Sequence, residues 1–172
     1  MKKHAMELIM GCLLLLCFYC LSREAAAVSA RMSQKKVIVV DCGHGGIDPG
    51  MIGIDGLKEK EFNLAIGMKL KKALEDYGYQ VVMTRETDTG LYDEDSQNKK
   101  AQDMQKRILL IQKVDPVLTV SIHQNSYEDP AVKGPQVFYY RDSAQGEALA
   151  KKIQEKLNEN LEVERPREIK GN

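Results

Sequence analysis

The fold follows from one stretch, residues 37–50, which reads VIVVDCGHGGIDPG. Its first four residues, Val37 to Val40, are β-branched and apolar without a break, as is typical of a strand buried on both faces of a parallel sheet. The glycines that follow allow the backbone to turn sharply around His44. We therefore expect a buried strand over 36–41 that delivers a histidine to a Gly-rich loop at its carboxyl end.

Strand and helix patterns alternate along the rest of the chain. Apolar residues at helical spacing predict helices over about 61–77, 101–114 and 143–157. Short apolar runs predict further strands over 79–84, 117–123 and 136–140. This alternation predicts an α/β fold with a mostly parallel, mixed sheet flanked by helices. Ligands of such folds bind at the carboxyl ends of the strands.

The N-terminal segment has the pattern of a targeting sequence. Lys2 and Lys3 precede an apolar run over 8–21, and small residues lead up to Ala30. We interpret residues 1–30 as a secretory signal peptide that is cleaved near Ala30. The apolar run is 14 residues long, shorter than the roughly 20 residues of a stable membrane-spanning helix. An uncleaved N-terminal anchor is the alternative, so we expect an exported protein, either secreted or membrane-anchored.

Charge and cysteine content further limit the class of protein to which the chain can belong. The chain has 25 basic and 25 acidic residues and a formal net charge of zero, so the basic character of a nucleic-acid-binding protein is missing and we expect no nucleic-acid partner. Three of the four cysteines lie within the first 30 residues, which leaves Cys42 alone in the remainder. An exported domain over 31–172 must then be held by its core or by a metal, since it cannot form an internal disulfide.

Two histidines occupy the expected carboxyl ends of strands. His44 follows the first strand and His123 ends the strand over 117–123, while the remaining histidine lies in the N-terminal segment. A catalytic zinc commonly takes two histidines and a carboxylate and keeps one position for water. Glu59 and Glu61 are both candidates for the carboxylate, although charge at a helix N-terminus is the more ordinary role for either. Their spacing does not distinguish them.

Five other residues could also contribute to a functional site. Cys42 could act as a thiol nucleophile, but a small buried residue is the commoner role. Asp41 or Asp48 could orient an imidazole, and turn formation is the more ordinary role of Asp48 before Pro-Gly. Arg85 and Arg107 could contact acidic groups of a substrate, but solvated or ion-paired arginines are more frequent.

Four motifs together resemble the zinc-dependent N-acetylmuramoyl-L-alanine amidases. Their order and spacing match over about residues 36–160. The motifs are VIVVDCGHGGIDPG at 37–50, EKEFNL at 59–64, Thr84-Arg85 with Asp88, and SIHQN at 121–125. This resemblance implies that zinc is held by His44, Glu59 and His123, and that the protein hydrolyses the amide bond between N-acetylmuramic acid and L-alanine in peptidoglycan.

Two further segments, 117–126 and 165–168, look most like the germination-specific amidases of endospore-forming bacteria. That likeness implies action on spore cortex peptidoglycan, where removal of the peptides allows muramic δ-lactam to form. It also implies a location outside the cytoplasmic membrane, such as the space between the forespore membranes, and a membrane lipoprotein as a further partner.

The chain departs from the family near its last residue. The family's catalytic glutamate belongs to a Val-Glu-x-Gly-Phe-like motif, and no such motif occurs before Asn172. We therefore expect an amidase domain over 31–172 that is truncated at its C-terminus and whose tail, 161–172, lacks a closing strand or helix. The catalytic residue stays unassigned. The alternative function is a catalytically silent module that holds zinc or binds peptidoglycan.

Overall fold

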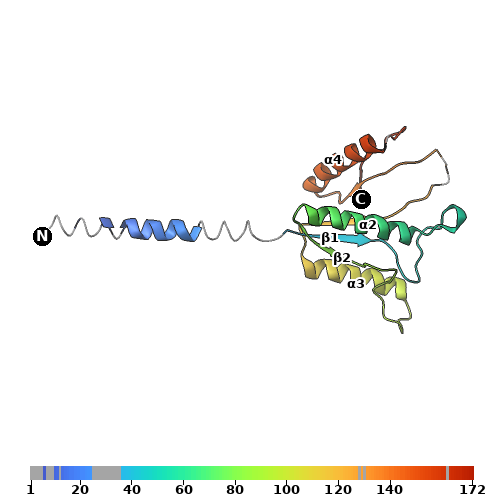
Figure 1. Cartoon of the computed structure of the whole chain (residues 1–172), viewed down its shortest axis with the longest axis horizontal. Coiled ribbons are helices and arrows are strands. Elements are labelled where there is room, and N and C mark those ends of the chain that lie inside the picture. The colour runs from blue at the N-terminus through green and yellow to red at the C-terminus, as the bar shows by residue number, and fades with distance from the viewer. Residues whose placement is uncertain are drawn as a thin grey trace. The chain divides into compact units, whose positions relative to one another are not determined.

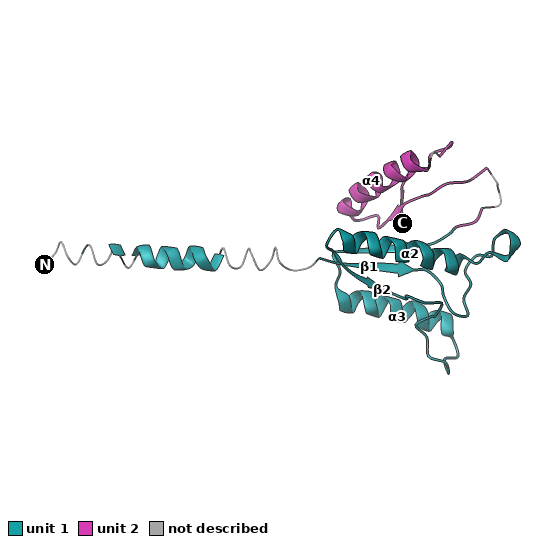
Figure 2. Ribbon diagram, viewed as in Figure 1, with its two compact units in different colours: residues 1–124 teal, residues 125–172 magenta. Residues whose placement is uncertain are grey.

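The computed structural model describes residues 6, 10–11, 13–24, 36–127, 129, 131–161 and 163–172. These residues form two compact units, 1–124 and 125–172, which are coloured separately in Figure 2. The course of the chain is shown in Figure 1.

Unit 1 is built on a three-stranded parallel sheet. Its strands are β1 (Val37–Cys42), β2 (Gln80–Met83) and β3 (Leu118–Ile122), in the order β2-β1-β3. Val39 and Val40 in the central strand are completely buried, as the unbroken apolar run predicted. Every strand pairing is parallel among the described residues, so the antiparallel component of the expected mixed sheet is not seen there.

Two helices cover the sheet of unit 1. Figure 1 shows α2 (Glu59–Asp76) and α3 (Lys99–Val114) on opposite sides of β1 and β2. Helix α2 contacts all three strands, and α3 contacts β1. Because a parallel sheet is covered on both faces in this way, its side chains can be apolar throughout. A short 3₁₀ helix, η1 (Ile54–Gly56), lies in the loop that leads to α2.

Helix α2 begins two residues before the predicted start at 61. The preceding loop provides acceptors for the first helical N–H groups: Glu59 donates to the carbonyl of Met51 at 2.9 Å, and Lys60 donates to the carbonyl of Pro49 at 3.1 Å. These bonds satisfy donors that a helix N-terminus otherwise leaves unpaired. As a result, both Glu59 and Glu61 lie in the first helical turn rather than before the helix.

Unit 2 contains α4 (Ala144–Asn160) and two short parallel strands, β4 (Phe138–Tyr139) and β5 (Lys170–Gly171). The predicted helix near Ser143 is confirmed, with the Ser143 hydroxyl accepting from the Gly146 N–H at the helix start. The expectation of a tail without a closing strand is wrong, because β5 pairs with β4 through backbone hydrogen bonds. The strand predicted over 136–140 is shortened to two residues.

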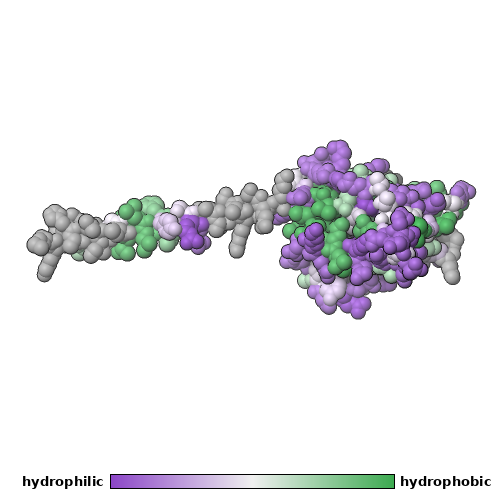
Figure 3. Space-filling view, turned by 90° about the horizontal axis from the view of Figure 1, so that it is seen from below, coloured by the Kyte–Doolittle hydropathy of each residue, from purple (hydrophilic) through white to green (hydrophobic). Residues whose placement is uncertain are grey.

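The N-terminal segment is described only in part. Residues 13–24 are helical, and their side chains are exposed, many of them apolar (Figure 3). The expected cleavage site near Ala30 lies outside the described residues. No helix among the described residues is both long and apolar enough to cross a membrane.

Candidate metal centre

The loop after β1 places His44 beside the end of β3. His44 adopts a positive φ of 62°, which non-glycine residues rarely adopt. Gly43, the residue before it, has no room for a side chain, because a Cβ there would overlap the imidazole of His123. Gly50 is equally confined: it has a φ of 68°, and a Cβ would lie 2.6 Å from Oε2 of Glu59. The glycines therefore allow two histidines and a glutamate to approach closely.

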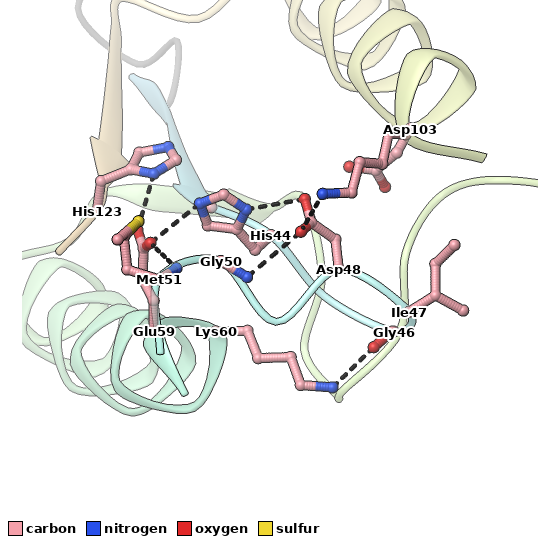
Figure 4. A network of polar contacts seen from close by, with 12 residues as sticks. His44, Gly46, Ile47, Asp48, Gly50, Met51, Glu59, Lys60, Asp103 and His123 are labelled. Carbon is pink, nitrogen blue, oxygen red and sulfur yellow. Dashed lines mark hydrogen bonds and ion pairs between the residues drawn. The ribbon is translucent and has the colours of Figure 1, made fainter. Parts of the chain in front are cut away.

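The three side chains predicted as ligands lie together. One ligand atom each of His44, Glu59 and His123 falls within 4.8 Å of the others. Nε2 of His44 is 3.2 Å from Oε2 of Glu59, and Nδ1 of His123 is 3.0 Å from Oε1 of the same carboxylate (Figure 4). Glu61, the alternative carboxylate, is exposed on α2 and does not belong to this cluster.

Glu59 is buried and held at both oxygens. Oε1 accepts from the backbone N–H of Gln124 at 2.8 Å and from Asn63 Nδ2 at 3.2 Å. Oε2 accepts from the backbone N–H of Met51 at 2.8 Å. Burial raises the pKa of Glu59, but the hydrogen bonds from Met51, Gln124 and Asn63 outweigh burial and leave the pKa below its usual value. The carboxylate is therefore anionic at neutral pH.

Asp48 orients His44 from the other side of the ring. Its Oδ2 lies 2.9 Å from Nδ1 of His44, and its Oδ1 accepts from Lys100 and from the Gly50 N–H (Figure 4). Burial raises the pKa of Asp48, yet the contacts with His44 and Lys100 lower it to about 2. An ionised carboxylate only accepts, so Asp48 favours the tautomer with the proton on Nδ1, in which Nε2, on the side of Glu59, is the atom that can bind a metal. Turn formation, the role favoured from the sequence, is therefore only part of what Asp48 does.

The donor set fits zinc. Two imidazoles and one carboxylate are a common catalytic zinc set, and the carboxylate–histidine contact from Asp48 to His44 is a usual feature around such ligands. The side chains of His44 and His123 are 24% and 45% exposed, so the cluster is accessible to solvent.

Comparison with known proteins identifies the family. Residues 38–172 match the family described as N-acetylmuramoyl-L-alanine amidase. The chain belongs to this amidase family. It is 39% identical over 130 residues to the germination-specific N-acetylmuramoyl-L-alanine amidase of Bacillus subtilis, covering 74% of this chain and 54% of that protein. It is 35% identical over 131 residues to the amidase AmiA of Escherichia coli, covering 75% and 41%.

Solved amidase structures share the fold. The CwlD amidase from Clostridioides difficile, solved in complex with the GerS lipoprotein, superposes with a TM-score of 0.76 at 37% identity, covering 80% of this chain and 73% of that one. The amidase AmiC2 of Nostoc punctiforme gives 0.68 at 34% identity, covering 81% and 71%. The chain spans about half the length, or less, of the two curated relatives above.

Two arginines of this amidase-family chain are buried, and the ion pairing expected from the sequence is confirmed for Arg107 alone. Arg107 is ion-paired, with Asp41 and Asp103 each at 2.6 Å, but it is also buried and donates to the carbonyl of His44 at 2.7 Å. Arg85 is buried as well, where a solvated or ion-paired side chain was expected. Periodicity gave no signal for Arg85, because all four of its acceptors are backbone carbonyls. The Thr-Arg motif of the family resemblance was the one available pointer.

Cys42 is a core residue of the amidase fold. It is completely buried, belongs to the same apolar cluster as Val40 and Met83, and faces Gly67 of α2. Burial raises the pKa of its thiol, and the nearby arginines do not offset this. A neutral, enclosed thiol is a poor nucleophile. This environment supports the structural interpretation of Cys42 over the thiol mechanism.

Proposed function

We propose that this protein is a zinc-dependent hydrolase that cleaves the amide bond between N-acetylmuramic acid and L-alanine in peptidoglycan. The observation that carries this proposal is the cluster of His44, Glu59 and His123 at the carboxyl ends of β1 and β3. The membership of residues 38–172 in the amidase family supports the choice of bond. The set of two histidines and one carboxylate supports the choice of zinc.

The chain's own residues prepare this chemistry. When bound, zinc lowers the pKa of a water ligand toward about 7 and polarises the amide carbonyl. Glu59 contributes a negative charge that is kept ionised by N–H donors. Asp48 holds the proton on Nδ1 of His44 and so leaves Nε2 free to bind metal. His123, nearly half exposed, borders the side from which a substrate can approach.

One observation favours a second function, in which the protein binds without hydrolysing. Among the described residues, the carboxylates that contact either imidazole are Asp48 and Glu59, and both are already engaged by several donors. Neither is therefore free to act as the general base of hydrolysis. A module that holds zinc or binds peptidoglycan without cleaving it is the alternative to the amidase.

The setting we propose is the cortex of the bacterial endospore. The Bacillus subtilis relative is named as germination-specific, which supports cortex peptidoglycan as the substrate and muramic δ-lactam formation as the later outcome. Export through residues 1–30 would bring the protein to that substrate, secreted or anchored in the space between the forespore membranes. The CwlD amidase was solved in complex with the GerS lipoprotein, which supports a membrane lipoprotein as a partner here.

One experiment tests both functions. The full chain is purified with zinc and incubated with cortex peptidoglycan, and the soluble products are read by mass spectrometry with and without a chelator. Release of peptides that begin at L-alanine, abolished by the chelator, is the result that the amidase function predicts. Bound zinc and sedimentation with cortex without peptide release would favour the silent module. Release that the chelator does not affect would contradict a zinc mechanism.

A further inference from the structure

Arg85 makes an unusual set of contacts next to the metal centre. The residue follows β2 and is only 4% exposed. Its guanidinium makes four hydrogen bonds, and all four acceptors are backbone carbonyls. Nε donates to Cys42 at 3.0 Å, Nη1 to Thr87 at 3.1 Å, and Nη2 to Gly43 at 3.1 Å and to Lys60 at 2.7 Å.

Two of these acceptors adjoin the predicted ligands in the sequence. Gly43 immediately precedes His44, and Lys60 immediately follows Glu59. A single nitrogen, Nη2, donates to both carbonyls. Arg85 therefore connects the loop that carries one ligand to the helix that carries another, and the planar guanidinium fixes the distance between them.

Neighbouring contacts strengthen the same connection. Asn63 Nδ2 donates to the Gly43 carbonyl at 3.1 Å and to Oε1 of Glu59 at 3.2 Å. The Gly43 carbonyl thus accepts from two donors that are both tied to the segment around Glu59. The loop also packs on the arginine stem, since a Cβ at Gly45 would lie 2.9 Å from Cδ of Arg85.

Burying a guanidinium is costly unless its donors are satisfied. Arg107, the other buried arginine of this region, is paired with Asp41 and Asp103. Arg85 instead directs its donors to carbonyls of the ligand-bearing segments. A lysine could keep the charge, but its ammonium cannot reproduce the planar fork that reaches four carbonyls at once.

We propose that Arg85 is a positioning residue that sets the separation of His44 and Glu59 and thereby arranges the metal centre before zinc binds. It acts through the backbone of Gly43 and Lys60 and touches neither metal nor substrate. This inference rests on the proposed zinc site. It goes beyond that site because it assigns part of the metal affinity to a residue outside the ligand set.

The test compares metal binding in three full-length variants. Zinc affinity is measured by competition with a chromophoric chelator, and Co²⁺ is substituted to record the visible absorption that reports ligand geometry. Arg85→Lys is the test variant. Val39→Ala, in the completely buried centre of β1, is the control for lost stability. Arg141→Lys, at an exposed position of unit 2, is the control for the chemical change.

We expect Arg85→Lys to bind zinc about 10- to 100-fold more weakly, as for other residues that support metal ligands, and to alter the Co²⁺ spectrum. Val39→Ala should melt at a lower temperature yet keep its zinc affinity and spectrum, and Arg141→Lys should match the wild type. Unchanged affinity and spectrum in Arg85→Lys would overturn the proposal. The proposal would also be overturned if Val39→Ala and Arg85→Lys had the same melting temperature and lost zinc affinity to the same extent.

Two further outcomes are also decisive. If Arg85→Lys stays unfolded at saturating zinc while Val39→Ala folds, Arg85 supports the fold rather than ligand spacing, and the proposal is overturned. If the wild type itself binds neither zinc nor Co²⁺, the proposed metal centre fails, a result distinct from failure of the role of Arg85 alone.

Discussion

Oε1 of Glu59 and Nδ1 of His123 lie 3.0 Å apart, although 64 residues separate them in the chain. The same oxygen accepts from the backbone N–H of Gln124 at 2.8 Å. The first turn of α2 is thus attached to the end of β3 through a side chain and a main-chain group. Because a backbone donor holds the carboxylate, its position depends on the fold and not only on its rotamer.

Asp48→Asn should weaken zinc binding by about 10- to 100-fold while the protein stays folded. An amide can present its NH₂ group to Nδ1 of His44, so the ring loses the acceptor that fixes its tautomer. Zinc affinity by chelator competition measures the effect. Asp55→Asn is the matched control: Asp55 is exposed with a φ of 60°, a conformation that asparagine tolerates. Equal affinities in the two variants would contradict this role of Asp48.

Gly43→Ala should disrupt the metal centre because its methyl group would occupy the space of the His123 imidazole. We expect a loss of about 1–3 kcal/mol in the free energy of unfolding, typical of overpacking, together with weaker zinc binding. Gly53→Ala is the control, since the nearest atom to a Cβ there is 3.7 Å away. Urea unfolding and zinc titration of both variants measure the difference. Gly43→Ala with wild-type zinc affinity would show that the approach of His123 is not required.

Asp41→Asn should reduce the stability of the protein at neutral pH and make that stability change less as the pH is lowered. Burial raises the pKa of Asp41, but the hydrogen bond from Ser121 and the guanidinium of Arg107 bring it below its usual value. A carboxyl with a lowered folded-state pKa stabilises the protein above its unfolded pKa, and this contribution disappears as the pH falls below about 4.

The expected loss for Asp41→Asn at pH 7 is about 3 kcal/mol, the low end for breaking a buried pair, because Arg107 keeps Asp103 as a partner. Urea unfolding at pH 7 and at pH 3 measures it, and the difference between wild type and variant should shrink at the lower pH. A difference that is constant with pH would mean that the ionised form of Asp41 contributes nothing.

Cys42→Ala should leave peptide release and zinc affinity intact. The thiol is enclosed in the core and its pKa is raised by burial, so we expect only a packing loss of about 1 kcal/mol. The mass-spectrometric assay with cortex peptidoglycan measures activity, and thermal unfolding measures the packing loss. Abolished release in a folded, zinc-loaded Cys42→Ala protein would revive the thiol mechanism.

Much of unit 1 could be predicted from sequence because its signals are local. The continuous apolar run Val37 to Val40 avoids water only if the strand is buried on both faces. The helical spacing of apolar residues in α2 and α3 gives each helix an apolar face, which requires a sheet to pack against. The two histidines follow strands, so parallel topology brings them to one edge. For these elements, the residues that are apolar in the sequence are the ones that must be buried in the fold, so the sequence pattern predicts the packing.

Other features depend on contacts that no local pattern encodes. The choice of Glu59 over Glu61 follows from where α2 begins, and that start depends on acceptors in a loop eight or more residues earlier. The role of Arg85 becomes visible only when the fold brings together its four carbonyl acceptors, which come from three segments of the chain. Strand β5 exists because backbone groups pair with β4, and Lys170-Gly171 has no strand pattern of its own.

Metal content tests most directly whether His44, Glu59 and His123 hold zinc. Glu59→Gln and Glu61→Gln each replace a carboxylate with an amide in the first turn of α2, but only Glu59 belongs to the cluster. After dialysis against trace zinc, the wild type and Glu61→Gln should retain about one zinc ion per chain, and Glu59→Gln should retain little while its circular dichroism is unchanged. Full zinc content in folded Glu59→Gln would contradict the account.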